Sequence, residues 1–457
     1  MLNTVSMILS SEDQKEIFDF AEKNSALAKN LYNAALFRIR QVFTGWDKER
    51  LTDNEQEISD EMQNTIAVYP KFKAKRVLNY NALDKILRAN KNPDFFSGLP
   101  MQTAQAVVRA AATDFSNWLK ALKQYKKDPS GFTGCPKMPG YKKSEHISFT
   151  VTNQDAVLYP SGDEDTCLLK LPGYGRGSRF PLKYVSADMN LRQISFKPYY
   201  GKYILMFVIE DMAPFFHPDL PECAGVDFGT DNIAAIACSD QTSVVYKGGA
   251  ILSENRLFAK SKGKAVSIIT KGHIHMHASS RHLDNLSLHH ACFMKDQMHK
   301  ISRDIVDYCV VHKVGALVLG VNKLWKQRAG IGKVSNQNFV SIPHATLCWM
   351  IQYKALSAGI TVIEQEESYT SKADVTAKDF IPTYGENDSK CSFSGSRTAR
   401  GSYRCHDGSL INADCNGAAN ILRKAFPDIW DHVDGFSFLA TPKSISFKTL
   451  TPVYRVA

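Results

Sequence analysis

The chain has 457 residues, of which 44% are hydrophobic and 22% are charged, with a formal net charge of +10 at pH 7. This length exceeds one ordinary core, so two or three domains are expected. The sequence has no apolar run of about 18 residues and no leader pattern, so we expect a cytoplasmic protein that neither spans a membrane nor is secreted. The ten cysteines form no CxxC pair, which is typical of reduced thiols rather than of a disulfide framework.

Positive charge is concentrated in two segments of the first half. Residues 71–91 hold seven basic residues against Asp84, and residues 120–143 hold seven lysines against Asp128. One such segment alone fits a solvated surface, but two, interleaved with aromatic residues, favour a polyanionic partner such as nucleic acid. The candidate contacts are Lys71, Lys73, Lys75, Arg76, Lys137, Lys142 and Lys143.

The first half reads as a helical insert in a β unit. Residues 1–10 predict a strand, and a helical pattern follows from Ser11, a suitable N-cap, to about Arg40. The clearest helix spans residues 99–127. One of its polar faces could contact base edges or phosphates, although an ordinary polar surface explains each residue slightly better. This face carries Gln102, Gln105 and Arg109.

Short alternating runs between residues 134 and 219 predict an antiparallel, barrel-like β domain, with residues 1–10 as a candidate additional strand. A different pattern begins at Pro221. There a three-strand meander precedes alternating helices and strands, an order typical of the ribonuclease-H-like fold. The predicted elements are strands 223–229, 233–238 and 243–247, helix 291–312, strand 314–320, helix 343–358 and strand 360–366.

Asp227 lies in "AGVDFGT", a segment that otherwise reads as buried sheet. A lone buried carboxylate is unfavourable unless it is paired or binds a cation, so other acids should converge on it. One candidate is Glu366 or Glu367 at the end of a strand, where only one of the two can face Asp227. Another is Asp414, which begins a helix. An exposed strand end and a simple N-cap remain alternative explanations.

Three carboxylates in one pocket repel each other, and a divalent cation removes this repulsion. Oxygen-only ligands favour Mg²⁺ or Mn²⁺, with Asp227, one of Glu366 and Glu367, and Asp414 as candidate ligands. Two such ions about 4 Å apart could hold the attacking water and the leaving oxygen of a phosphodiester.

Several segments together resemble the TnpB (OrfB) family, nucleases of insertion sequences from which type V CRISPR effectors derive. "GVDFGTDNIAAIA" is similar to the first RuvC motif of that family, and "INADCNGAANILRKA" is similar to the third. "CPKMPGYKKSEHISFT", "LPMQTAQAVVRA" and "KDQMHKISRDIVDY" match other recurring segments, so the resemblance covers almost the whole chain.

The resemblance implies an α+β multidomain protein with a ribonuclease-H-like (RuvC) nuclease domain in the C-terminal half. The N-terminal half would be a β-barrel wedge domain with a helical recognition insert. The implied boundaries are residues 1–10 for the first wedge strand, 11–130 for recognition, 131–220 for the wedge, 221–370 and 411–457 for the nuclease domain, and 371–410 for a degenerate zinc-ribbon-like loop. The implied partners are a guide RNA and double-stranded DNA with an adjacent motif, with a monomer favoured.

Two positions depart from the family pattern. Gly320 stands where the second RuvC motif usually has a glutamate, so either the catalytic glutamate has moved to the next strand or the pocket is inactive. We favour relocation, with Glu367 as first choice and Glu366 second. Ala373 stands where the first zinc-ligating cysteine is expected, leaving Cys391, Cys405 and His406. No structural zinc is therefore expected, and Arg397, Arg400 and Arg404 are candidates for guiding DNA.

The histidines at positions 273, 275, 277 and 282 fit an RNA-contacting segment better than a metal site, and the role of Trp325 stays open. The leading hypothesis is a Mg²⁺-dependent RNA-guided DNA endonuclease, with catalytic residues Asp227, Glu367 or Glu366, and Asp414. The alternatives are a nuclease-inactive RNA-guided DNA-binding regulator and a guide-independent RuvC-like nuclease, which would leave the basic first half without a task.

Overall fold

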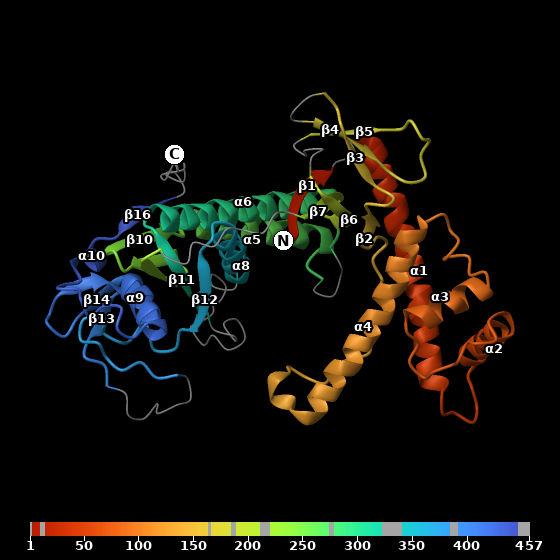
Figure 1. Ribbon diagram of the computed structural model, residues 1–457, viewed down its shortest axis with the longest axis horizontal. Coiled ribbons are helices and arrows are strands. Elements are labelled where there is room, and N and C mark those ends of the chain that lie inside the picture. The colour runs from red at the N-terminus through yellow and green to blue at the C-terminus, as the bar shows by residue number, and fades with distance from the viewer. Residues whose placement is uncertain are drawn as a thin grey trace. The chain divides into compact units, whose positions relative to one another are not determined.

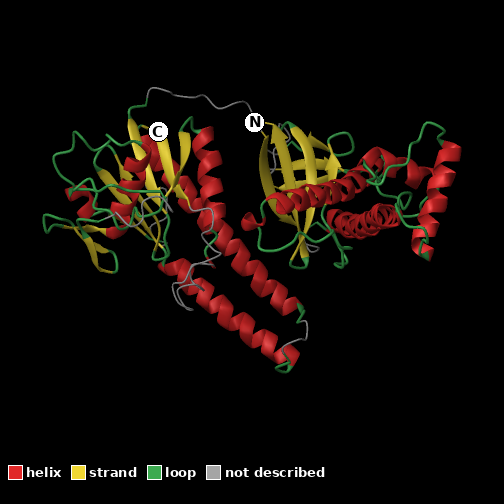
Figure 2. Cartoon of the chain, turned by 90° about the horizontal axis from the view of Figure 1, so that it is seen from below, coloured by secondary structure: helices red, strands yellow, loops and turns green. Residues whose placement is uncertain are grey.

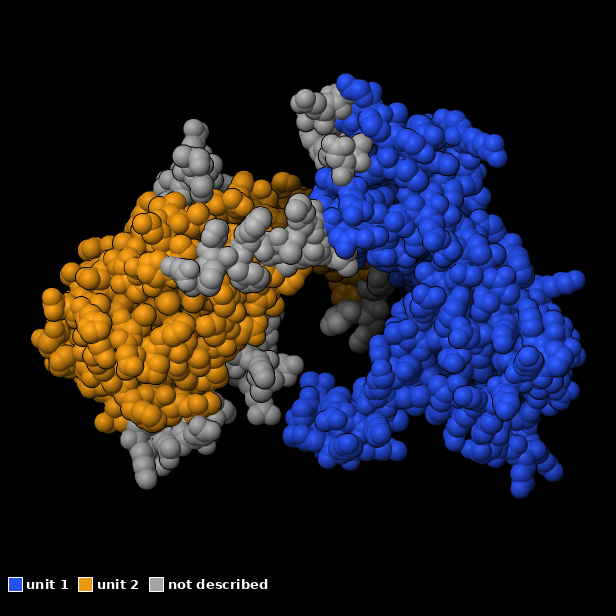
Figure 3. All heavy atoms as spheres, viewed as in Figure 1, with its two compact units in different colours: residues 1–212 blue, residues 213–457 orange. Residues whose placement is uncertain are grey.

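The computed structural model describes residues 2–9, 14–162, 166–183, 189–210, 220–273, 278–321, 341–383 and 392–446. The chain divides into two compact units, residues 1–212 and residues 213–457, which Figure 3 shows in different colours. Each unit combines helices with strands (Figures 1 and 2), so the prediction of a mixed α+β protein is confirmed. Within the described ranges, no helix is long and apolar enough to cross a lipid bilayer.

The first unit contains four α-helices in its described part. They are α1 (Lys15–Gly45), α2 (Asp53–Val68), α3 (Tyr80–Ala89) and α4 (Met101–Lys127), and a short 3₁₀ turn, η1 (Pro129–Gly131), follows. The predicted start of α1 was wrong, because the helix begins after Gln14, and it continues past Arg40; Ser11 itself lies outside the described residues. Thr52 and Glu55 form a capping box at the start of α2.

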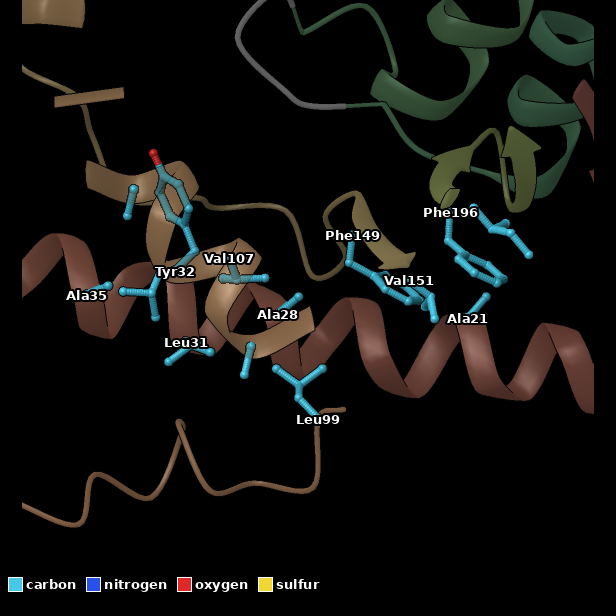
Figure 4. Close-up of a cluster of buried hydrophobic side chains, with 14 of the residues drawn as sticks. Ala21, Ala28, Leu31, Tyr32, Ala35, Leu99, Val107, Phe149, Val151 and Phe196 are labelled. Atoms are coloured by element: carbon cyan, nitrogen blue, oxygen red, sulfur yellow. The ribbon is translucent and has the colours of Figure 1, made fainter. Parts of the chain in front are cut away.

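The core of the first unit forms where α1 meets α4 and two strands, as Figure 4 shows. Ala21, Ala28 and Ala35 recur every seven residues on the buried side of α1, and their small side chains allow other elements to approach closely. Phe149 and Phe196 stack against each other with ring centroids 4.8 Å apart. The helices and the sheet therefore share one continuous apolar core.

Two antiparallel sheets make up the β part of this unit. The first has the order β1 (Leu2–Leu9), β7 (Lys202–Glu210), β6 (Leu191–Tyr199) and β2 (Phe149–Thr152); the second joins β3 (Val157–Pro160), β4 (Thr166–Lys170) and β5 (Phe180–Lys183). The first strand does return to this sheet, pairing from Leu2 opposite Glu210 to Leu9 opposite Tyr203. Hydrogen bonding among the described residues does not close either sheet into a barrel.

The second unit is built around a six-stranded mixed sheet. Its order is β12 (Thr361–Glu366), β11 (Val314–Val321), β8 (Glu222–Asp227), β9 (Asn232–Cys238), β10 (Thr242–Lys247) and β16 (Lys443–Ile445). The strands β8, β9 and β10 form the predicted antiparallel meander, whereas β11 and β12 add parallel to β8. The parallel strands β8, β11 and β12 therefore end at the same edge of the sheet.

Helices cover both faces of this sheet. The face that carries Val226 and Leu319 packs with α6 (Arg281–Val311) and α8 (His344–Ser357), and α5 (Gly249–Thr270) runs beside α6 (Figure 1). The opposite face packs against α9 (Ala413–Ala425). A small antiparallel sheet of β13 (Ser396–Ala399), β14 (Ser402–Arg404) and β15 (Leu410–Asn412) leads into α9, and α10 (Ser437–Ala440) follows it.

The predicted start of α6 at residue 291 was wrong. The helix begins at Arg281, after Ser280 accepts a hydrogen bond from the backbone N–H of Leu283. The first turns have a mostly polar, histidine-containing sequence, which obscured the apolar period that marks the rest of the helix.

A close approach of α9 to β8 sets the position of α9 on the sheet of the second unit. A methyl group at Gly225 of β8 would lie 2.3 Å from the carbonyl oxygen of Ala418 and 2.9 Å from Cβ of Leu422, both on α9. Only glycine permits this spacing without a shift of the helix.

We expect Gly225→Ala to destabilise the protein by about 1–3 kcal/mol, because the new methyl group collides with backbone that cannot move locally. Urea unfolding measures the change. Gly435→Ala is the matched control, since a methyl group there meets no heavy atom within 4 Å. Equal stability of the two variants would contradict the close packing of α9 on β8.

Candidate functional site

Asp227 is the last residue of β8 and faces the N-terminal turns of α9. The residue is partly exposed, but its carboxylate is enclosed beside Gly417, where a methyl group would lie 2.6 Å from Oδ2 of Asp227. The pKa of Asp227 is raised well above its usual range, first by burial and then by the charges of Glu367 and Asp414, with Arg397 acting in the opposite direction. Glu367 and Asp414 therefore both lie close enough to act on Asp227.

Asp414 does not cap its helix, so the N-cap explanation for this residue is wrong. Asn412 is the N-cap, and its side-chain oxygen accepts from the backbone N–H groups of Asp414 and Cys415. The Asp414 carboxylate instead accepts from Nδ2 of Asn232 at 2.6 Å and from Nη2 of Arg397 at 3.1 Å. The side chain of Asp414 is thus directed to Asn232 and Arg397 rather than to the backbone of its own helix.

The neighbouring glutamates have different surroundings. Glu366 forms an ion pair with Lys424 and accepts from the backbone N–H of Ser368 at 2.8 Å. Burial alone would raise the pKa of Glu366, but these hydrogen bonds outweigh it and lower the pKa. Glu367, in contrast, is the carboxylate whose charge acts on Asp227. The geometry therefore separates the two candidates and favours Glu367.

Gly320, the position of the missing glutamate, leaves room for the carboxylate of Glu367. A methyl group at Gly320 would lie 3.1 Å from Oε2 of Glu367, 3.2 Å from the carbonyl oxygen of Val226 and 2.5 Å from Cδ1 of Ile421. In the parallel register, Gly320 of β11 stands opposite Gln365 of β12, two residues before Glu367. The glycine and the displaced glutamate are thus spatially complementary.

An open groove of about 1380 Å³ runs past Asp227 and Asp414. Asp227 and Asp414 lie in its wall, together with the basic residues Lys247, Arg256, Arg397 and Arg400. Among the described residues, no group of three or more His, Cys, Asp or Glu side chains forms a ready-made metal site. Asn232 and Arg397 are the immediate protein partners of Asp414.

Asn232 was missed by sequence reasoning. It is buried with 6% of its surface exposed, and it begins β9, whose other residues are apolar or small. A single amide at the start of such a strand was the available signal, because a buried polar side chain requires a partner. That partner, Asp414, lies 182 residues further along the chain, so the sequence could not identify it.

The predicted DNA-guiding arginines lie on or beside the β13–β14 hairpin. Arg397 pairs with Asp414, Arg400 pairs with Asp231, and Arg404 is exposed on β14. Two of the three therefore contact acids of the groove wall.

Carboxylates make the hydrogen bonds of the segment that was predicted to be a degenerate zinc-ribbon-like loop. Asp374 is completely buried and accepts from Oγ1 of Thr376 at 2.6 Å and from the backbone N–H of His406 at 2.7 Å. Asp379 accepts from the backbone N–H of Asp374 at 2.8 Å and from that of Ser394 at 2.9 Å. These hydrogen bonds join the segment after β12 to the small sheet.

Most predicted basic contacts of the first unit are exposed. Lys142 lies 4.6 Å from the ring of Tyr32 and 3.9 Å from Asp114, Arg76 pairs with Asp47, and Arg109 lies over the ring of Tyr80. The other residues of this set are accessible or partly accessible on the surface: Lys71, Lys73, Lys75, Gln102, Gln105, Lys137 and Lys143. His275, His277, Trp325 and Cys391 lie outside the described residues.

We expect Asp374→Ala to lower the free energy of unfolding by about 1–3 kcal/mol, because it leaves buried donors of Thr376 and His406 without their acceptor. Thermal or urea unfolding measures the effect. Asp407→Ala is the control, since Asp407 makes the same kind of turn with Ser409 at an exposed position. A melting temperature lowered by a chelator instead would indicate a structural metal in this segment.

Two segments of the chain match known protein families. Residues 218–326 match the probable transposase family OrfB_IS605, and residues 344–421 match the Cas12f1-like TNB domain. Among curated proteins, none matches the sequence significantly.

Solved structures give a similar result for the fold. The structure described as the Cas12f1–sgRNA–target DNA complex is 14% identical with a TM-score of 0.52, covering 89% of this chain and 82% of that chain. The structure of the mini-RNA-guided endonuclease CRISPR-Cas_phi3 is 11% identical, covering 93% and 92%, but its TM-score of 0.43 is too low to support an argument. Two segments of the chain, residues 218–326 and 344–421, are therefore similar to the OrfB_IS605 transposase family and to the Cas12f1-like TNB domain, respectively.

Proposed function

We propose that this protein is an RNA-guided DNA endonuclease whose ribonuclease-H-like, RuvC-type domain lies in the second unit. The observation that carries the proposal is that Glu367 and Asp414 both act on Asp227, and that Asp227 and Asp414 line one groove. The meander with two parallel strands added to β8 has the strand order expected of this fold. The Cas12f1 structure, described as a complex with sgRNA and target DNA, supports the same partners here.

The donor set suits a hard divalent cation. All three candidate ligands are carboxylates, and their mutual repulsion would be relieved by a positive ion between them. Bound there, Mg²⁺ or Mn²⁺ would activate water and stabilise the leaving oxygen of a phosphodiester. Asp227 would be the shared ligand, Glu367 would supply the carboxylate that Gly320 lacks, and Asp414 would supply the third.

The chain's other residues keep these acids in position. Gly417 leaves space for Asp227, and Gly320 leaves space for Glu367. Asn232 fixes one oxygen of Asp414, and Lys424 holds Glu366 away from the cluster. This division of roles supports an active pocket with a relocated glutamate over a pocket that has lost a ligand.

The first unit would bind the guide RNA and the target DNA through its exposed basic residues. Base pairing with the guide would supply most of the sequence discrimination, and the protein would read a short adjacent motif. The candidate contacts remain those of the two basic segments and of α4: Lys71, Lys73, Lys75, Arg76, Gln102, Gln105, Arg109, Lys137, Lys142 and Lys143. We propose that one copy of the chain suffices for this task in the cytosol.

Plasmid cleavage by protein copurified with its RNA tests the proposal. We expect Asp227→Ala, Asp414→Ala and Glu367→Gln each to reduce the cleavage rate by roughly 10²-fold or more, because each removes a carboxylate that would hold the divalent cation at the reacting phosphate. Glu366→Gln is the matched control and should retain most of the rate, because Glu366 pairs with Lys424.

Loss of cleavage in Glu366→Gln with normal cleavage in Glu367→Gln would reverse the assignment of the second ligand. Tight, guide-dependent DNA binding without any cleavage by the unmodified protein would favour the nuclease-inactive regulator. Cleavage that survives ribonuclease treatment during purification would favour a guide-independent nuclease.

A second prediction concerns nucleic-acid affinity. The triple variant Lys137→Ala, Lys142→Ala and Lys143→Ala should bind more weakly and with a flatter salt dependence, losing roughly 0.7–0.9 from the slope per phosphate contact removed. Lys142 should contribute less than the others, because it already lies near Asp114 and Tyr32. The position of cleavage should not change. Binding measured as a function of salt provides the test.

Lys197→Ala is the control for this series, since Lys197 is an exposed lysine of β6 outside both basic segments. An unchanged affinity and salt slope in the triple variant would mean that these lysines are only a solvated surface.

A further inference from the structure

The carboxylate of Asp414 has two different kinds of partner. Asn232 donates to Oδ2 from a buried position, with only 6% of its surface exposed. Arg397 donates to Oδ1 from the other side, and 46% of its side chain is exposed. One oxygen is therefore held by a fixed amide, and the other is held by a cation that reaches it from solvent.

The Arg397 side chain can leave Asp414 without a change in the backbone around it. Ser402 of β14 pairs with Asn412 of β15, and the backbone N–H of Ala413 donates to the carbonyl oxygen of Gly401 at 3.1 Å. These bonds attach the β13–β14 hairpin to the start of α9. Exchange of Arg397 is thus a side-chain movement, and an ion pair between partly exposed groups is weak enough to permit it.

We propose that Arg397 is a built-in counter-ion of the carboxylate cluster, which competes with the divalent cation for Asp414. The inference rests on the proposed function, because it requires that the cluster bind a cation. With the groove empty, Arg397 supplies the positive charge that Asp414 needs. When Asp414 turns its Oδ1 to a cation, Arg397 must release it.

A phosphodiester in the groove would help this release. Arg397 and Arg400 both lie in the groove wall, and both are paired with aspartates there, Asp414 and Asp231. Phosphate oxygens are strong alternative acceptors for guanidinium groups. Nucleic acid that takes Arg397 from Asp414 would raise the affinity for the cation, and by linkage the cation would favour nucleic-acid binding in the groove. The cluster would then bind its cation tightly only when the groove is filled.

Binding of Mn²⁺ to the full chain freed of nucleic acid, followed by electron paramagnetic resonance, tests the proposal. We expect Arg397→Ala to bind Mn²⁺ about five- to tenfold more tightly than the unmodified protein. Arg404→Ala is the matched control, because it removes the same charge from the same hairpin at an exposed position of β14. A short single-stranded DNA should raise the Mn²⁺ affinity of the unmodified protein but not that of Arg397→Ala.

Asp414→Asn distinguishes failure of the counter-ion role of Arg397 from failure of the proposed function. Thermal unfolding checks that this variant folds. Loss of Mn²⁺ binding in Asp414→Asn, with equal affinities for Arg397→Ala and Arg404→Ala, would overturn the counter-ion role and leave the proposed function intact. Mn²⁺ binding unaffected by Asp414→Asn and Asp227→Asn would overturn both.

Discussion

The approach of α9 to β8 is the constraint on which the candidate site depends. Asp227 is the last residue of β8, and Asp414 is the second residue of α9. The distance between these two elements therefore decides whether the two acids share a groove. Glycines make the approach possible at two levels, Gly225 beneath Ala418 and Leu422, and Gly417 beside the carboxylate of Asp227. A larger residue at either position would move the helix, and the acids would separate together with it.

The same packing is electrostatically unfavourable, because it brings negatively charged carboxylates together in partly buried surroundings. Three features moderate it: the partial positive charge at the N-terminus of α9, the amide of Asn232, and the guanidinium of Arg397. The negative charge of Glu366 is compensated by its ion pair with Lys424. Burial and, after it, the charges of Glu367 and Asp414 nevertheless keep the pKa of Asp227 well above its usual range.

Sequence reasoning identified what depends on local pattern. An acid at the end of an apolar strand is visible as a break in hydrophobicity, which is how Asp227 and the glutamate pair were found, and the helix after Asp414 has a clear apolar face. Contacts between distant segments were not visible. Asn232, the Asp374 hydrogen bonds and the arginine pairs each depend on residues far apart in the chain. The start of α6 was missed because its first turns lack an apolar period.

The proposed relocation of the glutamate has a physical reason in the packing. β11 lies between β8 and β12, so its end is directly beside Asp227, whereas Glu367 must reach across from the edge strand. A side chain at position 320 would occupy the path of that reach and would also meet Ile421 of α9. A glutamate that acts from just beyond the end of β12 therefore requires a residue without a side chain at position 320 of β11. Neither change would serve the site without the other. Gly320, which in the sequence left relocation and loss of a ligand as competing explanations, provides the space that Glu367 would need as the relocated ligand.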